Sequence, residues 1–264
     1  MWRGLVVVEV LLAVQPPQVW AAAQPISIQA DAAIAREGGQ VLEAVGHVVL
    51  SDSATTLRAD YALYRRKEGH IRLTGHVHIA TVQGELSGDR ATSQLGRKGQ
   101  IETIEATGAV MVRSANRTVR ADRVTYQTRD QTLTASGHVV VTFPPDLKIT
   151  GGTLVASGAE VAVLTGRPRI EHPAGTLVGD RVDIAVQSQI AFVRGNVQSS
   201  FSETKITSTL ATLLVKDKKA IFRDHVTVDR PGRTMTAEVV TYYYAERRLV
   251  AEGPTTIKIR QMPP

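Results

Sequence analysis

A short pattern, Ala-x-Gly-x-Val, recurs along the chain at an almost constant spacing, and this spacing limits the fold more than any other feature. Aligned on the glycine, the copies fall at Gly46, Gly75, Gly108, Gly137, Gly166, Gly195, Asp224 and Gly253. The interval is 29 residues, except for one of 33 between Gly75 and Gly108, where the extra residues fall in the polar segment 96–99. A fixed period of this length is typical of repeat architectures in which successive units stack on one another.

A second anchor, most often aspartate, follows each glycine position by 14 residues. Its members are Asp31, one period before the next, and then Asp60, Asp89, Asp122, Gly151, Asp180, Thr209 and Glu238. The two anchors describe about eight 29-residue repeats, so we predict a single domain over residues 24–264. Pro144-Pro145 and Lys148 interrupt the pattern, which predicts a local irregularity near residues 143–152.

The residues around each glycine anchor alternate between apolar and polar, which predicts short strands with one buried face. Around Gly75, every second residue from Ile71 to Ile79 is apolar or glycine, whereas Arg72 and His76 are polar. No segment after residue 23 shows a helical period. The sequence therefore predicts a chain of strands stacked repeat upon repeat.

The alternation slips by one residue at each aspartate anchor. Leu57 and Ala59 are the apolar residues before Asp60, and Ala62 and Tyr64 are those after it. A strand that changes face without changing direction needs a bulge or a corner. We expect the aspartate to accept hydrogen bonds from nearby backbone N–H groups at this corner.

These features predict an all-β fold, an elongated open β-jellyroll with two stacked curved sheets whose apolar faces meet in one lengthwise core. Aromatic residues make up only 5% of the chain, so most inward positions are aliphatic. If the two sheets splay apart, the core becomes a groove that can bury lipid chains. The residues predicted to line it are Leu57, Leu73, Val77, Ile79, Ile104, Val110, Val112, Val119, Leu133, Val139, Val141, Leu177, Val193, Val197, Ile206, Phe222, Val226 and Met235.

The first 23 residues have the features of a cleavable export signal. Arg3 precedes the short apolar run 5–14, and the alanines at 21–23 provide a cleavage site. The alternative is a buried N-terminal helix. The chain has no cysteine, which excludes disulfides and a lipid-anchored lipoprotein. We therefore predict an exported, periplasmic protein that is stabilised by its core alone.

The net charge of +6 suits anionic partners but does not select among them. The histidines that follow the glycine anchor, such as His47 and His76, point outward, and we predict no metal site. Corner capping explains the aspartates better than calcium binding does. We find no catalytic constellation, so we predict neither enzymatic activity nor a cofactor. The scarcity of aromatic residues disfavours nucleic-acid binding.

The array resembles the OstA-like, LptA-type family of the lipopolysaccharide-transport (Lpt) system. The resemblance covers about residues 26–259 and rests on Ala59-Asp60 and Tyr64 with Gly75-His76-Val77, and on Ala121-Asp122 and Tyr126 with Gly137-His138-Val139. It implies an open jellyroll, often called a β-taco, whose groove holds the acyl chains of lipopolysaccharide. It also implies a periplasmic bridge from the inner to the outer membrane. The chain after residue 23 is longer than the typical bridge protein, so it is either an elongated bridge subunit or an LptC-like relative on the inner-membrane side.

The two ends of such a stack expose strand edges that can recruit another strand. The predicted docking residues are Ile26 and Ile28 at one end and Leu249, Ile257 and Ile259 at the other. The expected partners are lipopolysaccharide or a related acylated lipid, other Lpt components at both ends, and further copies of the chain joined head to tail.

Two alternatives remain open from the sequence. The first is a closed β-solenoid that serves as a structural or adhesive envelope protein, without lipid transport. The second is a repeat-built polysaccharide-processing enzyme. The inward positions vary between Ala, Leu, Tyr, Thr and Gly instead of stacking identical residues, which favours a groove over a closed solenoid.

Overall fold

The computed structural model describes residues 27–51, 55–81, 84–96, 101–114, 117–158 and 161–259. The chain falls into two compact units by its contacts. Unit 1 comprises residues up to 137 together with 157–159, and unit 2 comprises residues 138–156 and 160 onward. The prediction of one domain over residues 24–264 did not include this division, and each unit is described by itself.

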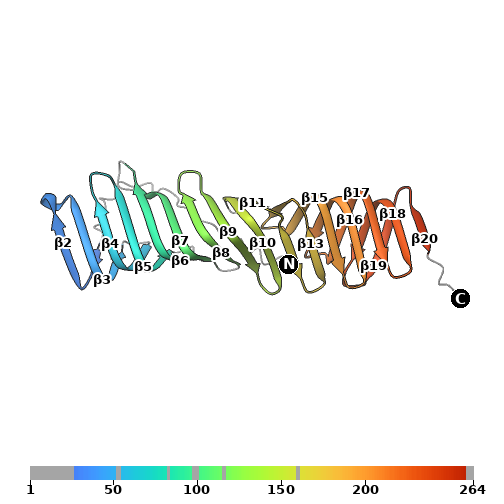
Figure 1. The fold of residues 1–264 in the computed structure, drawn as a ribbon, viewed down its shortest axis with the longest axis horizontal. Helices are drawn as coiled ribbons and strands as arrows, with labels where there is room; N and C mark the ends of the chain where they lie inside the picture. Colours follow the sequence, from blue (N-terminus) through green and yellow to red (C-terminus); the bar gives the residue numbers. More distant parts are fainter. Residues whose placement is uncertain are drawn as a thin grey trace, which may run out of the picture. The chain divides into compact units, whose positions relative to one another are not determined.

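Unit 1 is a series of antiparallel strands in which each strand from β3 to β8 pairs with the next. Figure 1 shows these strands side by side, from blue to green. Its elements are β1 (Ser27–Gln29), β2 (Ala32–Arg36), the 3₁₀ helix η1 (Glu37–Gly39), β3 (Val41–Ser51), β4 (Thr55–Arg65), β5 (His70–Thr81), β6 (Gly84–Leu95), β7 (Ile101–Ser114), β8 (Arg117–Gln127) and the first half of β9 (Thr132–Phe143). Both β1 and β2 pair with β3, so together they act as one strand broken at Asp31.

Unit 2 repeats this antiparallel pattern with several broken strands. Its elements are the second half of β9, β10 (Leu147–Ser157), β11 (Val161–Thr165), β12 (Arg169–His172), β13 (Gly175–Val178), β14 (Arg181–Ala185), β15 (Ile190–Phe201), β16 (Thr204–Leu214), β17 (Lys219–Arg230), β18 (Arg233–Tyr243), β19 (Arg248–Glu252) and β20 (Thr256–Ile259). Strands β13 and β14 both pair with β15, and β19 and β20 both pair with β18.

A corner interrupts each long strand at the predicted anchors. The glycine and the residue after it both have a positive φ, as at Gly75 (78°) and His76 (45°). Asp224, which replaces glycine in one copy, keeps a positive φ of 64°. The strand register shifts at the same places, for example between Thr74 and Val77 where β5 pairs with β6. A corner is therefore present, but its positive-φ residues lie at the glycine anchor of one strand, opposite the aspartate anchor of the next, where the change in alternation had predicted it.

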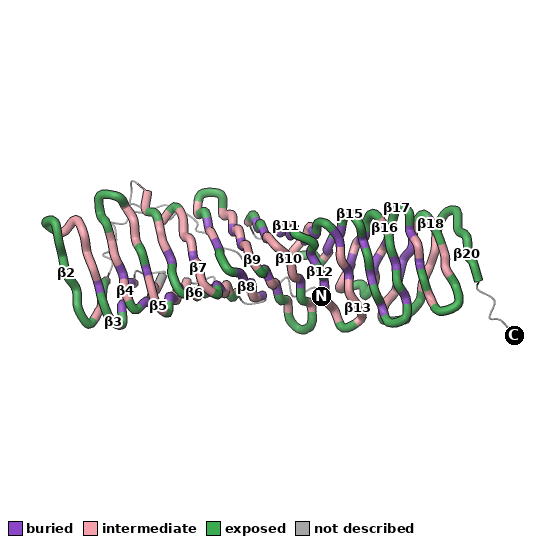
Figure 2. Tube along the Cα trace, viewed as in Figure 1, coloured by how far each residue is buried: buried purple, intermediate pink, exposed green. Residues whose placement is uncertain are grey.

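Each corner divides its strand between two walls that enclose the core. We call wall A the strand halves that precede a glycine anchor or follow an aspartate anchor, such as residues 70–74 of β5 and 90–95 of β6. Wall B consists of the halves on the other side of each corner, such as residues 77–81 of β5 and 84–88 of β6. Buried and exposed residues alternate along both halves (Figure 2). The inward sets match the predicted ones, including the change of parity at Asp60.

Close packing of an aspartate against the next glycine is found at five of the corners, those of Gly46, Gly75, Gly108, Gly137 and Gly195. A side-chain carbon on Gly75 would overlap the Asp60 carboxylate, so this position has no room for one. The carboxylate of Asp60 also lies 2.8 Å from Nδ1 of His76, and the pair Asp31 and His47 repeats this bond at 2.8 Å. In unit 2 the side-chain amide of Asn196 donates to Asp180 at the same distance of 2.8 Å. The partner of these carboxylates is thus a side chain, where we had expected backbone N–H groups.

The corners at which His47 or His76 bonds an aspartate predict that the stability of unit 1 depends on pH. The hydrogen bond to Asp60, followed by its charge, raises the pKa of His76 above its ordinary value of 6.5. The pKa of His76 is higher in the folded chain than in the unfolded chain, so the pairing of protonated His76 with Asp60 stabilises the fold. This stabilisation is complete below about pH 6.5 and is lost as the pH rises through the raised pKa. We expect an NMR titration of the His76 ring to show this raised midpoint, and the midpoint to fall in Asp60→Asn.

The substitution His76→Asn provides a matched control, because Asn196 holds the equivalent corner with an amide that does not titrate. We expect the variant to keep the corner and to lose this part of the pH dependence of unfolding. A His76 midpoint that Asp60→Asn leaves unchanged would contradict the assignment.

The all-β jellyroll class is confirmed, since the described residues contain β-strands, one 3₁₀ turn and no α-helix. The predicted irregularity at 143–152 includes a cis Pro144-Pro145 bond in the turn between β9 and β10. The predicted export signal at 1–23 and the extra residues of the segment 96–99 lie wholly or mostly outside the described residues.

Candidate functional site

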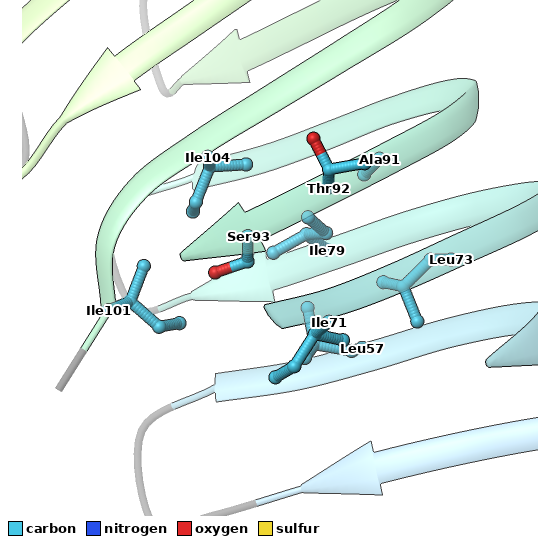
Figure 3. A pocket seen from close by; sticks show the side chains of 9 residues that line it. All are labelled: Leu57, Ile71, Leu73, Ile79, Ala91, Thr92, Ser93, Ile101 and Ile104. Atoms are coloured by element: carbon cyan, nitrogen blue, oxygen red, sulfur yellow. The ribbon is translucent and has the colours of Figure 1, made fainter. Parts of the chain in front are cut away.

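An apolar cavity lies between the two walls of unit 1. Both walls contribute to its lining. Wall B provides Leu57 and Ile79, and wall A provides Ile71, Leu73, Ala91, Thr92, Ser93, Ile101 and Ile104. Figure 3 shows these side chains projecting from strands β4 to β7 into a shared space. Strand β5 contributes from both sides of its corner, because Ile71 precedes Gly75 and Ile79 follows it. The corner is therefore what brings the two halves of one strand face to face.

The cavity is narrow in this conformation. Its volume is about 20 Å³, within about 310 Å³ of unfilled space that includes adjoining solvent. A volume of 20 Å³ holds about one water molecule. An acyl chain therefore fits only if wall A and wall B move further apart.

The cavity lining is partly exposed and almost entirely apolar. Leu57, Ile71, Ile101 and Ile104 are half-buried, so their apolar surface remains in contact with solvent. The hydroxyl of Ser93 is buried and makes no hydrogen bond to a described residue. A lining of this kind favours a ligand that is apolar along its length.

The structure places the predicted lining residues inside the two units. Leu57, Leu73, Ile79 and Ile104 line the cavity itself. The others are buried or half-buried between the walls, and Val112 and Met235 are half-buried. Their contact with a lipid stays a prediction. Five residues of the cavity lining were not on the predicted list, namely Ile71, Ala91, Thr92, Ser93 and Ile101. Ile101 adjoins the irregular segment where the period breaks.

A cluster of aromatic rings lies in unit 2. The ring centroids of Phe201 and Tyr242 lie 4.9 Å apart, and the Phe201 ring is parallel to that of Tyr244 at 6.4 Å. Tyr244 also contacts His172, with centroids 5.3 Å apart, and Phe222 meets Phe201 edge-on. The ring pairs of the described residues all belong to unit 2, so the two interiors differ in chemistry.

The outermost strands leave apolar side chains exposed at both predicted edges. Ile257 and Ile259 of β20 are 58% and 77% exposed, and Ile28 of β1 is 43% exposed. Leu249 of β19 is half-buried, and Ile26 lies outside the described residues. Within the described pairings, β20 contacts only β18 and β1 contacts only β3. Docking at these edges stays a prediction.

Within the described residues, no group of three or more His, Asp or Glu side chains is arranged to hold a metal ion. Nor does the described part of the chain contain a helix of sufficient length and hydropathy to traverse a bilayer.

The corners, the two walls and the apolar lining define a β-jellyroll protein with an apolar cavity between its walls. A family model described as "LptA/(LptD N-terminal domain) LPS transport protein" matches residues 27–162. The match covers more than half of the chain, and the chain therefore belongs to this family of lipopolysaccharide-transport proteins. The resemblance noted in the sequence is confirmed.

Comparison with individual proteins adds little to this assignment. One similar solved structure is LptH from Pseudomonas aeruginosa, described as the LptA homologous periplasmic component of the conserved lipopolysaccharide transport device. It is 18% identical, with 56% of this chain and 95% of that chain covered and a TM-score of 0.27, which is too low to support an inference. No curated protein matches the sequence.

Proposed function

We propose that this protein is a periplasmic bridge component of lipopolysaccharide transport and that it holds acyl chains between the walls of unit 1. The observation that carries the proposal is the apolar cavity to which both halves of β5 contribute. Each CH₂ group removed from water stabilises the complex by about 0.8 kcal/mol. Aliphatic walls without directional polar contacts also allow a chain to slide along them.

The exposed edge strands support the second part of the proposal, in which copies or other Lpt components join end to end. Apolar edge strands bind a further strand through backbone hydrogen bonds and gain from covering their side chains. Transfer from the inner to the outer membrane would then proceed along a row of such grooves.

Photo-crosslinking in cells tests the groove directly. Ile71 and Arg72 are neighbours on β5, and Ile71 lines the cavity whereas Arg72 is exposed on the outer face. We expect a photoreactive residue at position 71 to capture lipopolysaccharide and one at position 72 to capture little. Equal capture at both positions, or none at 71, would count against the proposal and in favour of a closed structural protein.

A further inference from the structure

The ring contacts of unit 2 join its two walls at the side farthest from the corners. Phe201 lies six residues after the anchor Gly195, on wall B. Tyr244 lies six residues after the anchor Glu238, on wall A. Strands β15 and β18 are not paired with each other, so the contact between Phe201 and Tyr244 crosses the core. We call His172, Phe201, Tyr242 and Tyr244 the ring latch.

Several contacts hold the ring latch in place. The Tyr244 hydroxyl donates to the carbonyl of Val215 at 3.1 Å, and its backbone N–H donates to the carbonyl of Lys218 at 3.2 Å. On the other wall, the N–H of Ala174 donates to Nδ1 of His172 at 3.1 Å. The Phe201 ring passes so close to Gly175 that a side-chain carbon there would lie 2.6 Å from Cδ1. The latch is thus tied to the backbone on both walls.

Unit 1 has no counterpart to this latch at the equivalent described positions. Six residues after its glycine anchors, wall B carries Thr81 and Ser114. Six residues after its aspartate anchors, wall A carries Arg66, Leu95 and Thr128. These described positions of unit 1 therefore carry no aromatic ring that could join the two walls.

We infer that the ring latch closes the interior of unit 2 to acyl chains and that unit 1 is the part of the protein that accepts them. This inference rests on the proposed function. Burial agrees with it, because Phe201, Phe222 and Tyr242 are each less than 5% exposed, whereas several residues of the unit 1 cavity remain half-buried. Unit 2 takes an acyl chain only after the latch opens.

Single cysteines at equivalent positions can test this, because the chain contains no cysteine. Ile79 and Val228 each lie four residues after a glycine-position anchor on wall B, and they are 5% and 2% exposed. We would measure alkylation of Ile79→Cys and Val228→Cys by iodoacetamide, with and without purified lipopolysaccharide. We expect Ile79→Cys to react faster and to be protected by the lipid, and Val228→Cys to react slowly at a rate that the lipid does not change.

Substitutions that open the latch should make Val228→Cys react with iodoacetamide in the same way as Ile79→Cys. In Phe201→Leu/Tyr244→Leu we expect alkylation of Val228→Cys to rise roughly tenfold, since several ring contacts are lost, and to become sensitive to lipopolysaccharide. Phe222→Leu is the matched control, because it removes a buried ring that does not lie at the mouth, and should change the rate little. If the double variant fails to fold, Tyr244→Phe keeps the ring, removes only the bond to Val215, and should raise the rate by a smaller factor.

The outcomes separate the inference from the proposed function. Protection of Val228→Cys by lipopolysaccharide with the latch intact, or an unchanged alkylation rate in the latch variants, would overturn the inference. Loss of protection at Ile79→Cys alone would overturn acyl binding in unit 1, while the lipid-free rates would still decide whether the latch closes unit 2.

Discussion

Replacing Gly75 by alanine should lower the free energy of unfolding by more than the about 1–2 kcal/mol that backbone strain alone costs. Two costs combine in this estimate. Alanine at a φ of 78° is strained by about 1–2 kcal/mol relative to glycine. Its Cβ would also displace the Asp60 carboxylate, which breaks the bond to His76. The quantity to measure is the free energy of unfolding from urea titrations followed by circular dichroism.

Gly39→Ala is the matched control within unit 1. Gly39 has a φ of 83°, and a side-chain carbon there meets nothing within 4 Å. It should therefore show the backbone strain alone, about 1–2 kcal/mol. In the Asp60→Ala background the cost of Gly75→Ala should fall to that of Gly39→Ala, because no carboxylate is left to displace. Equal costs for Gly75→Ala and Gly39→Ala in the parent chain would show that Asp60 does not fix the corner.

The sequence predicted the corners because local geometry decides them. A one-residue change of alternation at Asp60 cannot occur in a straight strand, so it requires a bulge whatever the strand pairs with. At Asp224 the sequence predicted only that the repeat keeps its phase, and the positive φ of 64° at this position was found in the structure. The identity of the inward residues followed for the same reason, from Leu57 on β4 to Met235 on β18.

The bond between Asp60 and His76 was beyond prediction because it joins residues 16 apart whose meeting depends on the strand register. The sequence placed both residues at anchors but gave no reason to bring them together. The ring latch is a stronger case, since Phe201 ends β15, Tyr244 follows β18, and these two strands are not paired with each other. Alternation indicates that a residue points inward, but not which residue it faces on the other wall.

The sequence predicted the apolar lining of the candidate site but not its location in unit 1. Alternation placed Leu73 and Ile79 inside, and both line the cavity. It did not indicate that the cavity would lie in unit 1 or that the ring pairs would lie in unit 2. That distinction depends on side-chain volume and on which rings oppose one another, because cores pack densely wherever complementary shapes meet.

Charging the last strand should abolish end-to-end association of the protein. Met235 pairs with Ile257 and is itself half-buried, so Ile257 and Ile259 continue the inward face where the stack ends. Covering these two side chains contributes about 1.5–3 kcal/mol each, so Ile257→Lys/Ile259→Lys should weaken association by about 100-fold or more. Thr256→Lys is the control, because Thr256 is exposed on the same strand but faces outward.

The measurement is mass photometry of residues 24–264 over a range of concentrations. We expect oligomers that grow with concentration for the parent chain and for Thr256→Lys, and monomers for the double variant. A parent chain that stays monomeric at every concentration would argue against self-association, and a double variant that still assembles would exclude this edge.

Mixing two variants can establish which edges meet. Ile28→Lys should block the opposite edge, where Ile28 pairs with Leu50 and remains exposed. Each variant alone then keeps one intact edge and should be monomeric if assembly is head to tail, because an intact edge finds no complementary partner. A mixture of Ile28→Lys with Ile257→Lys/Ile259→Lys should form one-to-one dimers and stop there, since the two remaining edges complement each other once. Dimers of a single variant would instead mean that like edges pair with each other, and a row of grooves running in one direction could not form.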